Sequence, residues 1–310
     1  MNDSKLVNTT VVTAGDQAYS WGVLLLAASM RMNGMPHPVL VGAMGWTERM
    51  KRLVSSLGNI TIIDIPPSRQ CVACQKPRML ASDAAETDWV CWVDSDGIFV
   101  GDCSEWLEGT DPDEMRIKRA DPVPADFTPE NLLTWQRDVE RFLGRALPES
   151  RYATRVQSGV ILVHRKWRPF LDRWDAQIGN VLPDSVGILM KPGTAYFQTD
   201  ESVLSSLLCF DPDAPRVSET YKFDGRSDRT RFYAHFGYNP KPWQMWNTYA
   251  SRWRGETYAT VGWLVENGIV KSADVPFPLR RSWWPVCRSV APLAPWAWRA
   301  IKLKRKLLGA

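Results

Sequence analysis

The chain has 310 residues, of which 45% are hydrophobic and 23% are charged, as in a globular protein with one large α/β domain or two smaller ones. Its net charge of +4 has a local origin, because every charged residue from Arg280 onward is basic and the rest of the chain is slightly acidic. A slightly acidic body argues against a protein that binds nucleic acid.

Strands and helices alternate through the first ninety residues. Strands are predicted over residues 6–13, 37–44, 59–65 and 89–93, which are rich in β-branched and apolar side chains. Helices are predicted over residues 21–32, 48–57 and 76–85, the second of them capped by Thr47. This alternation predicts an α/β fold with a mostly parallel central sheet, in which ligands bind beyond the carboxyl ends of the strands.

Two aspartates, Asp94 and Asp96, follow the last of these strands. Residues 89–93 are apolar without alternation, which indicates a strand buried on both faces. Carboxylates at the end of a buried strand need neutralisation, and two acids one residue apart can converge on one divalent cation. Asp-Ser-Asp-Gly is also good turn chemistry, so a solvated turn is the alternative interpretation.

Residues 110–155 interrupt the alternation with many prolines and charges. Within them Thr128, Pro129 and Glu130 have the chemistry of a helix start: a cap, a first-turn proline and an acid that complements the dipole. We interpret this segment as an excursion from the sheet. It either covers or contacts a substrate, or simply packs over a sheet edge.

Polar motifs flank the two elements that follow this excursion. Gln157, Ser158 and Gly159 open a strand predicted over residues 155–163, which leads into a helix predicted over residues 167–178. Asp200 and Glu201 begin a further helix, where acids also serve simply to complement the helix dipole.

A stiff loop runs from His235 to Trp243. It contains a conformationally permissive glycine at Gly237, and Lys241 lies between two prolines. A lone histidine is usually structural. Because this loop also contains a glycine and a lysine held between two prolines, we favour a functional role for it.

The composition changes at Pro276 to prolines, tryptophans and basic residues. We therefore divide the chain into a main domain over residues 1–275 and a helical C-terminal extension over residues 276–310. A short helix with Trp and Leu beside a cationic face suits an anionic membrane surface, with residues 280–310 as the anchor. A solvated tail, or one bound to a protein partner, is the alternative.

We expect a cytoplasmic protein, peripheral on the inner face of the cell membrane. The N-terminal residues lead directly into a predicted strand, and no apolar run reaches the ~20 residues of a transmembrane helix. Six cysteines are too few for a dense disulfide framework, so we expect free thiols. Cys71 and Cys74 have zinc spacing, but no second Cys or His pair completes such a site.

Taken together, the motifs over roughly residues 7–246 resemble the retaining GT-A glycosyltransferases of the family-8 type. These enzymes share a Rossmann-like nucleotide-diphospho-sugar transferase fold and move a sugar from a nucleotide donor. The resemblance rests on the order of the motifs. Asp94-Ser95-Asp96 matches the family's DxD motif, and the downstream segment from His235 to Trp243 resembles its His-x-x-Gly-x-x-Lys-Pro-Trp motif. The glycine here falls one position early, at Gly237.

The resemblance implies a role for each motif. Asp94, Asp96 and His235 would hold Mn²⁺ or Mg²⁺, with Lys241 and a backbone group near Gly237 on the diphosphate. Ala14 and Asp16 would contact the base and ribose, and Tyr19 would stack on the uracil. Lys76 or Arg78 would be the basic residue at the donor, while Gln157, Ser158 and Asp200 would contact the sugar. Glu201 would lie near the reacting carbon, as a nucleophile or an ion-pair stabiliser.

The function expected from the sequence is metal-dependent transfer of a hexose, glucose or galactose, from a UDP-sugar. The acceptor expected is a lipid-linked or surface glycan, and the resemblance implies retention of anomeric configuration. Two alternatives remain open: a non-catalytic carbohydrate- or membrane-binding protein on the same fold, and a sugar-nucleotide hydrolase. Metal-dependent UDP release, with and without acceptor, distinguishes the three.

Overall fold

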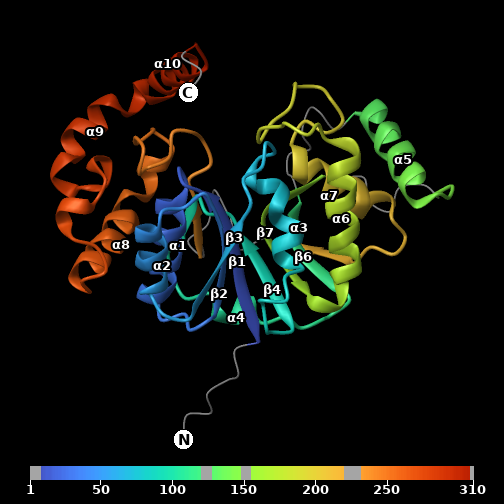
Figure 1. Ribbon diagram of the computed structural model, residues 1–310, viewed down its shortest axis with the longest axis horizontal. Helices are drawn as coiled ribbons and strands as arrows, with labels where there is room; N and C mark the ends of the chain where they lie inside the picture. The colour runs from blue at the N-terminus through green and yellow to red at the C-terminus, as the bar shows by residue number, and fades with distance from the viewer. Residues whose placement is uncertain (1–7, 120–127, 148–154, 220–231, 308–310) are drawn as a thin grey trace, which may run out of the picture.

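The computed structural model describes residues 8–119, 128–147, 155–219 and 232–307, without the side chains of residues 119, 219, 302 and 304–307. The first two residues of the strand predicted over 6–13 therefore lie outside the described residues, as do parts of the excursion and the last three residues of the extension. Within the described part, a seven-stranded sheet forms the centre of the molecule, with helices on both faces (Figure 1).

The sheet has the strand order β3-β2-β1-β4-β7-β6-β8. Six of its strands run parallel to one another, and only β7 runs antiparallel to its neighbours β4 and β6. The strands are β1 (Thr9–Asp16), β2 (Val39–Met44), β3 (Ile60–Ile65), β4 (Trp89–Val93), β6 (Glu114–Arg119), β7 (Val156–His164) and β8 (Arg216–Glu219). The predicted fold class, α/β with a mostly parallel central sheet, is confirmed.

Helices bury both faces of the sheet (Figure 1). One face carries α1 (Ser20–Met32), α2 (Glu48–Ser55) and α8 (Arg254–Glu266); the other carries α3 (Lys76–Leu80), α5 (Pro129–Leu143), α6 (Arg168–Val181) and α7 (Thr199–Phe210). The sequence of the central strand β4 is apolar throughout because both of its faces are buried. Cys91 and Val93 belong to the core on the α1 side, whereas Val90 and Trp92 belong to the core on the α6 side.

Two predicted helix starts are confirmed by their caps. The Thr47 hydroxyl accepts a hydrogen bond from the backbone N–H of Met50 at 3.3 Å, and that of Thr128 accepts one from Asn131 at 3.2 Å. Each bond satisfies one of the N–H groups that a helix start leaves unpaired.

Two expectations about local structure were wrong. The helix predicted over residues 76–85 ends at Leu80, and the Ser82 hydroxyl then accepts a hydrogen bond from the N–H of Ala84 at 3.3 Å. Such local side-chain bonding competes with the helix. The segment 110–155 does not leave the sheet altogether, because its strand β6 pairs with both β7 and β8.

A separate two-stranded sheet of β5 (Gly97–Phe99) and β9 (Tyr233–His235) lies beside the end of β4. The C-terminal residues form the helical region predicted, mainly α9 (Trp284–Val290) and α10 (Ala294–Leu307). Leu279 and Cys287 join the core on the α1 side, so this region packs against the body. Among the described residues, no helix has both the length and the apolar character needed to cross a bilayer.

Candidate functional site

Backbone pairing at the carboxyl end of β4 brings Asp94, Asp96 and His235 together. The Asp94 N–H donates to the carbonyl of Gly159 on β7 at 2.9 Å, which continues the ladder just past the strand. Gly97 then pairs with His235 across the small β5–β9 sheet, and the Phe236 N–H donates to the Asp96 carbonyl at 2.8 Å. Segments far apart in the chain are thereby fixed to one another by main-chain hydrogen bonds.

The three side chains are of types that commonly bind metal ions, and they lie close together. Each offers one ligand atom, and these atoms all lie within 4.8 Å of one another. Within the described part of the chain, no other group of three His, Cys, Asp or Glu residues has this spacing. Two carboxylates and an imidazole suit a divalent cation of the Mn²⁺ or Mg²⁺ class, so the residues present fit the metal that the sequence suggests.

Asp96 lies between a histidine and a lysine. His235 Nε2 lies 2.9 Å from Oδ1, and Lys241 Nζ lies 2.5 Å from Oδ2. Burial alone would raise the pKa of Asp96, but the charges of His235 and Lys241 outweigh it and lower that pKa. Burial likewise acts to lower the pKa of His235, and the Asp96 carboxylate outweighs it and raises that pKa.

Lys241 is held by its own loop. Its side chain is 2% exposed, and its ammonium also donates to the carbonyl of Gly237 at 2.6 Å. Gly237 has φ 57°, a left-handed conformation that glycine adopts without strain. The glycine that falls one position early in the motif thus turns a carbonyl toward Lys241.

Lys76 connects Asp94, a candidate metal ligand, with Asp200, one of the predicted sugar-binding residues. Its ammonium lies 3.2 Å from Oδ1 of Asp94 and 3.1 Å from Oδ2 of Asp200. It also donates to the hydroxyl of Ser158 at 2.8 Å, and that hydroxyl donates to Asp200 at 3.1 Å. Because the lysine side chain is only 4% exposed, this is a buried and fully paired charge.

The carboxylates that Lys76 contacts set its ionisation. Burial would lower the pKa of Lys76, but Asp200 and Asp94 outweigh it and raise that pKa, so the residue stays cationic. Burial raises the pKa of Asp94 despite the nearby Lys76. Asp94 also accepts a hydrogen bond from the indole N–H of Trp92 at 2.7 Å, which fixes its orientation.

Glu201 lies on the other side of Ser158, with partners that the sequence did not predict. Its Oε2 accepts the N–H of Ser158 at 2.9 Å, and its Oε1 lies 3.5 Å from Nε of Arg155. The side-chain amide of Gln198, oriented to satisfy its neighbours, joins Glu201 to Arg155. Its nitrogen donates to Oε1 of Glu201 at 3.1 Å, and its oxygen accepts from Nη2 of Arg155 at 3.1 Å. Burial raises the pKa of Glu201 to about 7, although Arg155 opposes the shift.

Tyr19 and Asp16 lie at the carboxyl end of β1. The Asp16 carboxylate accepts the N–H of Tyr19 at 3.0 Å, and the Tyr19 hydroxyl donates to Asn239 at 3.2 Å. The Tyr19 ring meets Trp243 edge-on, with ring centres 5.8 Å apart. Ala14 is buried within β1, two residues before Asp16. The turn after β1 is thus tied to the loop that carries Lys241.

A glycine permits the close approach of helix α1 to the Asp94–Asp96 turn. A Cβ on Gly22 would lie 2.2 Å from the carbonyl oxygen of Ser95 and 2.5 Å from the Trp243 ring. Only a residue without a side chain fits there. The buried Ser95 is therefore packed directly against the helix backbone.

Two predicted site residues lie apart from these contacts. The Arg78 side chain is 64% exposed, and its Nε lies 2.7 Å from Asp175 on α6. Gln157 is half-buried on β7, where it pairs with Lys118 of β6. Of the two basic residues suggested for the donor, Lys76 is the one in contact with Asp94.

Comparison with solved structures supports the architecture. No family model matches the chain, and no curated protein matches its sequence. A structure of the galactosyltransferase LgtC in complex with donor and acceptor sugar analogues is similar, with a TM-score of 0.51, 15% identity, and coverage of 89% of this chain and 99% of LgtC.

Two other glycosyltransferases are similar over much of the chain. The bifunctional enzyme WbbM has a TM-score of 0.49 and 14% identity, with coverage of 81% of this chain and 49% of WbbM, so the chain spans about half the length of that protein. GlyE of Streptococcus pneumoniae TIGR4 has a TM-score of 0.48 and 16% identity, with coverage of 87% of this chain and 66% of GlyE. At such identities the likeness to LgtC shows the fold alone: this chain has the GT-A type of fold expected from its sequence.

Proposed function

We propose that this protein is a metal-dependent glycosyltransferase that moves a hexose from a UDP-sugar to a lipid-linked or surface-glycan acceptor, with retention of anomeric configuration. The observation that carries the proposal is the convergence of Asp94, Asp96 and His235, with Lys241 beside them, on a fold that LgtC also has. A scaffold that had lost catalysis would have little reason to keep buried carboxylates together at such a point.

The proposed roles follow from where negative charge develops when UDP leaves. Asp94, Asp96 and His235 would hold a divalent cation, which would stabilise the charge on the departing diphosphate. Lys241 adds a fixed positive charge there. Its contact with Asp96 keeps it within the same cluster, and the Gly237 turn supplies the backbone nearest to it.

The sugar is proposed to lie toward Lys76, Ser158 and Asp200. Asp200 offers carboxylate oxygens for sugar hydroxyls, and its carbonyl accepts the Trp174 indole N–H at 3.1 Å, which anchors this end of α7.

Thr199, the residue before Asp200, has φ 43°. A left-handed β-branched residue is strained, and its hydroxyl bond of 3.0 Å to the Ile188 carbonyl helps to hold that conformation.

Glu201 is proposed as the carboxylate nearest to the reacting carbon. In its ionised form it opposes the positive charge that develops at that carbon, or attacks it directly. Asp16 and Tyr19 are assigned to the ribose and base at the end of β1, with Ala14 in the same turn. These assignments are proposals drawn from the motif resemblance and supported by the side-chain contacts described above.

The acceptor side is proposed to face a membrane. Leu293 and Trp296 in the C-terminal region are 63% and 68% exposed, and Arg299 lies over the Trp296 ring at 5.2 Å. Exposed aromatic and leucine side chains beside basic ones suit the surface of an anionic bilayer. This supports a peripheral position on the cytoplasmic face of the cell membrane, with residues 276–310 as the contacting extension and residues 110–155 as a second candidate acceptor region.

The test is UDP release from a panel of UDP-hexoses, with and without Mn²⁺, by the full chain and by Asp94→Ala. We expect release from one donor that requires the metal and falls by about a hundredfold or more in Asp94→Ala, as when a stabilising group is removed from a developing charge. Release that increases when a glycolipid acceptor is added supports transfer. Metal-dependent release that no acceptor accelerates would instead identify a hydrolase, and no metal-dependent release from any donor would contradict an enzymatic role.

A further inference from the structure

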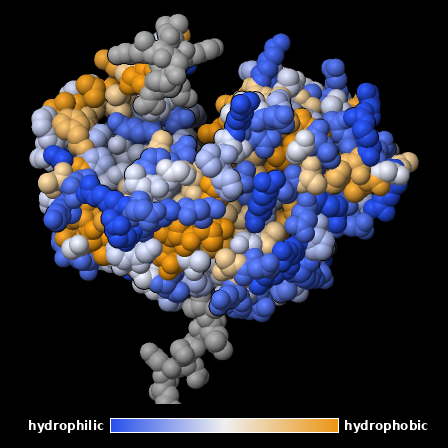
Figure 2. Space-filling model, viewed as in Figure 1, coloured by the Kyte–Doolittle hydropathy of each residue, from blue (hydrophilic) through white to orange (hydrophobic). Residues whose placement is uncertain are grey.

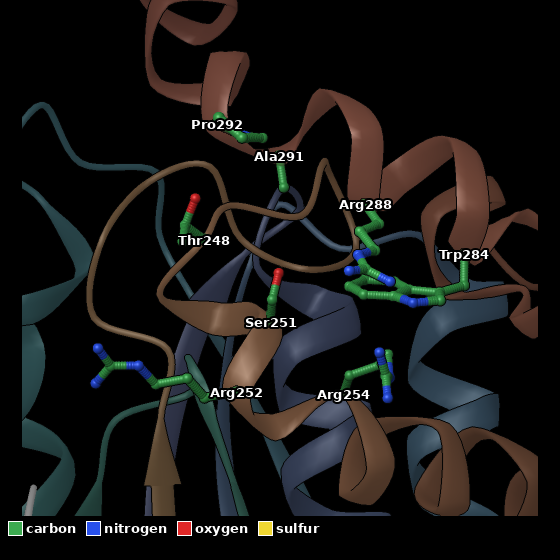
Figure 3. Close-up of a pocket in the computed structure, with 8 residues that line it drawn as sticks. All are labelled: Thr248, Ser251, Arg252, Arg254, Trp284, Arg288, Ala291 and Pro292. Atoms are coloured by element: carbon green, nitrogen blue, oxygen red, sulfur yellow. The ribbon is translucent and has the colours of Figure 1, made fainter.

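A cavity of about 490 Å³ opens between the C-terminal helices and the body of the protein. Its lower wall is the segment from Thr248 to Arg254, which includes the short helix η3 (Ala250–Trp253) and the start of α8. Its upper wall is α9 with the first residues of η7 (Ala291–Leu293) (Figure 3). The residues of the proposed donor site do not line it.

Three arginines line this cavity, Arg252, Arg254 and Arg288. The guanidinium carbon of Arg252 lies 5.1 Å from the centre of the Tyr249 ring, whereas the other two arginines lie beside Trp284 (Figure 3). Trp284 and Arg288 lie one turn apart on α9, and the guanidinium carbon of Arg254 lies 4.6 Å from the centre of the Trp284 ring. Figure 3 shows both guanidinium groups beside that ring. Among the described residues, no carboxylate forms an ion pair with Arg254 or Arg288, and both side chains are exposed. Planar guanidinium groups without an acid partner suit the bidentate binding of phosphate.

The cavity is rigidly built around Trp284. The centre of its ring lies 5.7 Å from that of Trp246 and 6.4 Å from that of Tyr258, both edge-on. Trp246 is fully buried, and its indole N–H donates to the carbonyl of Pro278 at 2.7 Å. The stacking platform for Arg254 is therefore a partly buried ring packed against the core, and less entropy is lost when an anion binds.

The lower wall of the cavity is tied to the loop that carries Lys241. Asn247, directly before Thr248, donates from its amide to the carbonyls of Tyr238 at 3.2 Å and Pro240 at 2.8 Å. Tyr249 meets Tyr238 edge-on at 5.2 Å. A group held in the cavity would thus be positioned by the same backbone that positions the proposed diphosphate-binding lysine.

An apolar edge begins where the cavity ends. Ala291 and Pro292 line the cavity, and Val290, Leu293 and Trp296 beside them in the chain are 41%, 63% and 68% exposed. Figure 2 shows hydrophobic side chains along the edge of the molecule that α9 and α10 form. A cationic cavity that opens beside an apolar edge matches a ligand with a phosphate at one end and a hydrocarbon chain at the other.

We propose that Arg254 and Arg288 bind the phosphate group of a lipid phosphate, so that the acceptor is a glycan carried on a lipid-linked phosphate or diphosphate. This inference rests on the proposed transfer function and specifies its acceptor class. The phosphate lies against the two guanidinium groups. The hydrocarbon chain follows Leu293 and Trp296 into the bilayer.

The test measures binding of the full chain to phosphatidylcholine vesicles by cosedimentation, without donor or metal. One set contains a polyprenyl monophosphate, and a second contains phosphatidylglycerol at matched surface charge. Because no catalysis is involved, a protein that fails as a transferase can still pass this test, and an active transferase can fail it. The variants are Arg254→Gln and Arg288→Gln, with Arg281→Gln as the matched control, since Arg281 is also exposed but does not line this cavity.

We expect the wild-type chain to bind polyprenyl phosphate vesicles about tenfold more tightly than phosphatidylglycerol vesicles, a preference that Arg254→Gln and Arg288→Gln abolish and Arg281→Gln retains. Equal binding to both vesicle types, or equal loss in Arg281→Gln, would overturn the proposal in favour of diffuse attraction to negative charge. Displacement from the vesicles by an equal concentration of inorganic pyrophosphate would also overturn it, because the cavity would then bind a soluble diphosphate.

Discussion

The Nε2 atom of His235 lies 2.9 Å from Oδ1 of Asp96, although 139 residues separate the two in the chain. The pairing of β5 with β9 creates this contact, and Lys241 takes the other oxygen of the same carboxylate. A histidine and a lysine far downstream in the sequence thus converge on the Asp94–Asp96 turn. The proposed metal and diphosphate roles depend on this relationship.

Lys76 and Arg78 offer a matched pair of substitutions on one short helix. In Lys76→Met the buried carboxylates of Asp94 and Asp200 lose a shared partner, so we expect the free energy of unfolding to fall by about 3–5 kcal/mol. Arg78→Met removes an exposed ion pair with Asp175, and we expect a loss of less than about 1 kcal/mol. Urea denaturation followed by circular dichroism measures both. Equal losses would contradict the assignment of Lys76 to the buried network.

Glu201 gives the reaction an expected pH dependence. Its pKa is raised to about 7 by burial, so the carboxyl group is mostly protonated at pH 6 and mostly ionised at pH 8. If the carboxylate faces developing positive charge, kcat/KM at saturating Mn²⁺ rises as pH increases through about 7. The variant Glu201→Gln should lose this limb of the profile along with most of its activity. A residual activity with the same pH dependence would assign the limb to another group.

Stability should depend on pH at Glu201 in the opposite direction. A carboxyl group whose folded pKa is raised contributes most below its unfolded value, and that contribution is lost as pH rises toward 7. Relative to Glu201→Gln, the wild-type chain should therefore lose stability between about pH 5 and pH 7. Urea denaturation at several pH values measures the difference, and a pH-independent difference would contradict the raised pKa.

Gly22 tests the packing of α1 against the metal-site turn. In Gly22→Ala the new methyl group would overlap the Ser95 carbonyl and the Trp243 ring, so we expect a loss of about 1–3 kcal/mol in the free energy of unfolding. Gly179→Ala is the control, because a methyl group on that helical glycine of α6 would have nothing within 4 Å and should leave the chain equally stable or slightly more stable. Equal stability of the two variants would mean that α1 does not approach Ser95 so closely.

The exposed C-terminal edge gives a test of membrane contact. Trp296→Ser removes a side chain that is 68% exposed, and we expect binding to anionic vesicles to weaken by about tenfold. Leu133→Ser is the control, because Leu133 is 51% exposed and belongs to α5, which lies on the opposite side of the molecule (Figure 1). Vesicle cosedimentation measures both variants. Unchanged binding in Trp296→Ser would contradict the proposed anchor.

The sequence predicted the order of strands and helices well where a segment is buried on both faces. The run from Trp89 to Val93 is one example, because its uniform apolar character reflects two cores. It did not predict β6, in which Met115 and Ile117 are buried between charged neighbours. It also gave no direction for β7. Strand direction depends on how distant segments meet, which local patterning does not encode.

The candidate site shows the same division between local and distant information. Asp94 and Asp96 follow a buried strand, so local chemistry suggests a cation. The choice between Lys76 and Arg78 depends on where Ser158 and Asp200 lie, and neither position follows from the helix sequence. The partners of Glu201 were also not predicted, although a buried carboxylate always raises the question of which cation or N–H group neutralises it.

The most direct measurement of the central claim is the position of Mn²⁺, located by anomalous scattering in crystals grown with Mn²⁺ and UDP. We expect one strong anomalous peak within coordination distance of Asp94, Asp96 and His235, with the UDP diphosphate bound to the same ion and Lys241 beside it. UDP bound with no anomalous peak at these three residues, or with the ion held elsewhere, would contradict the account.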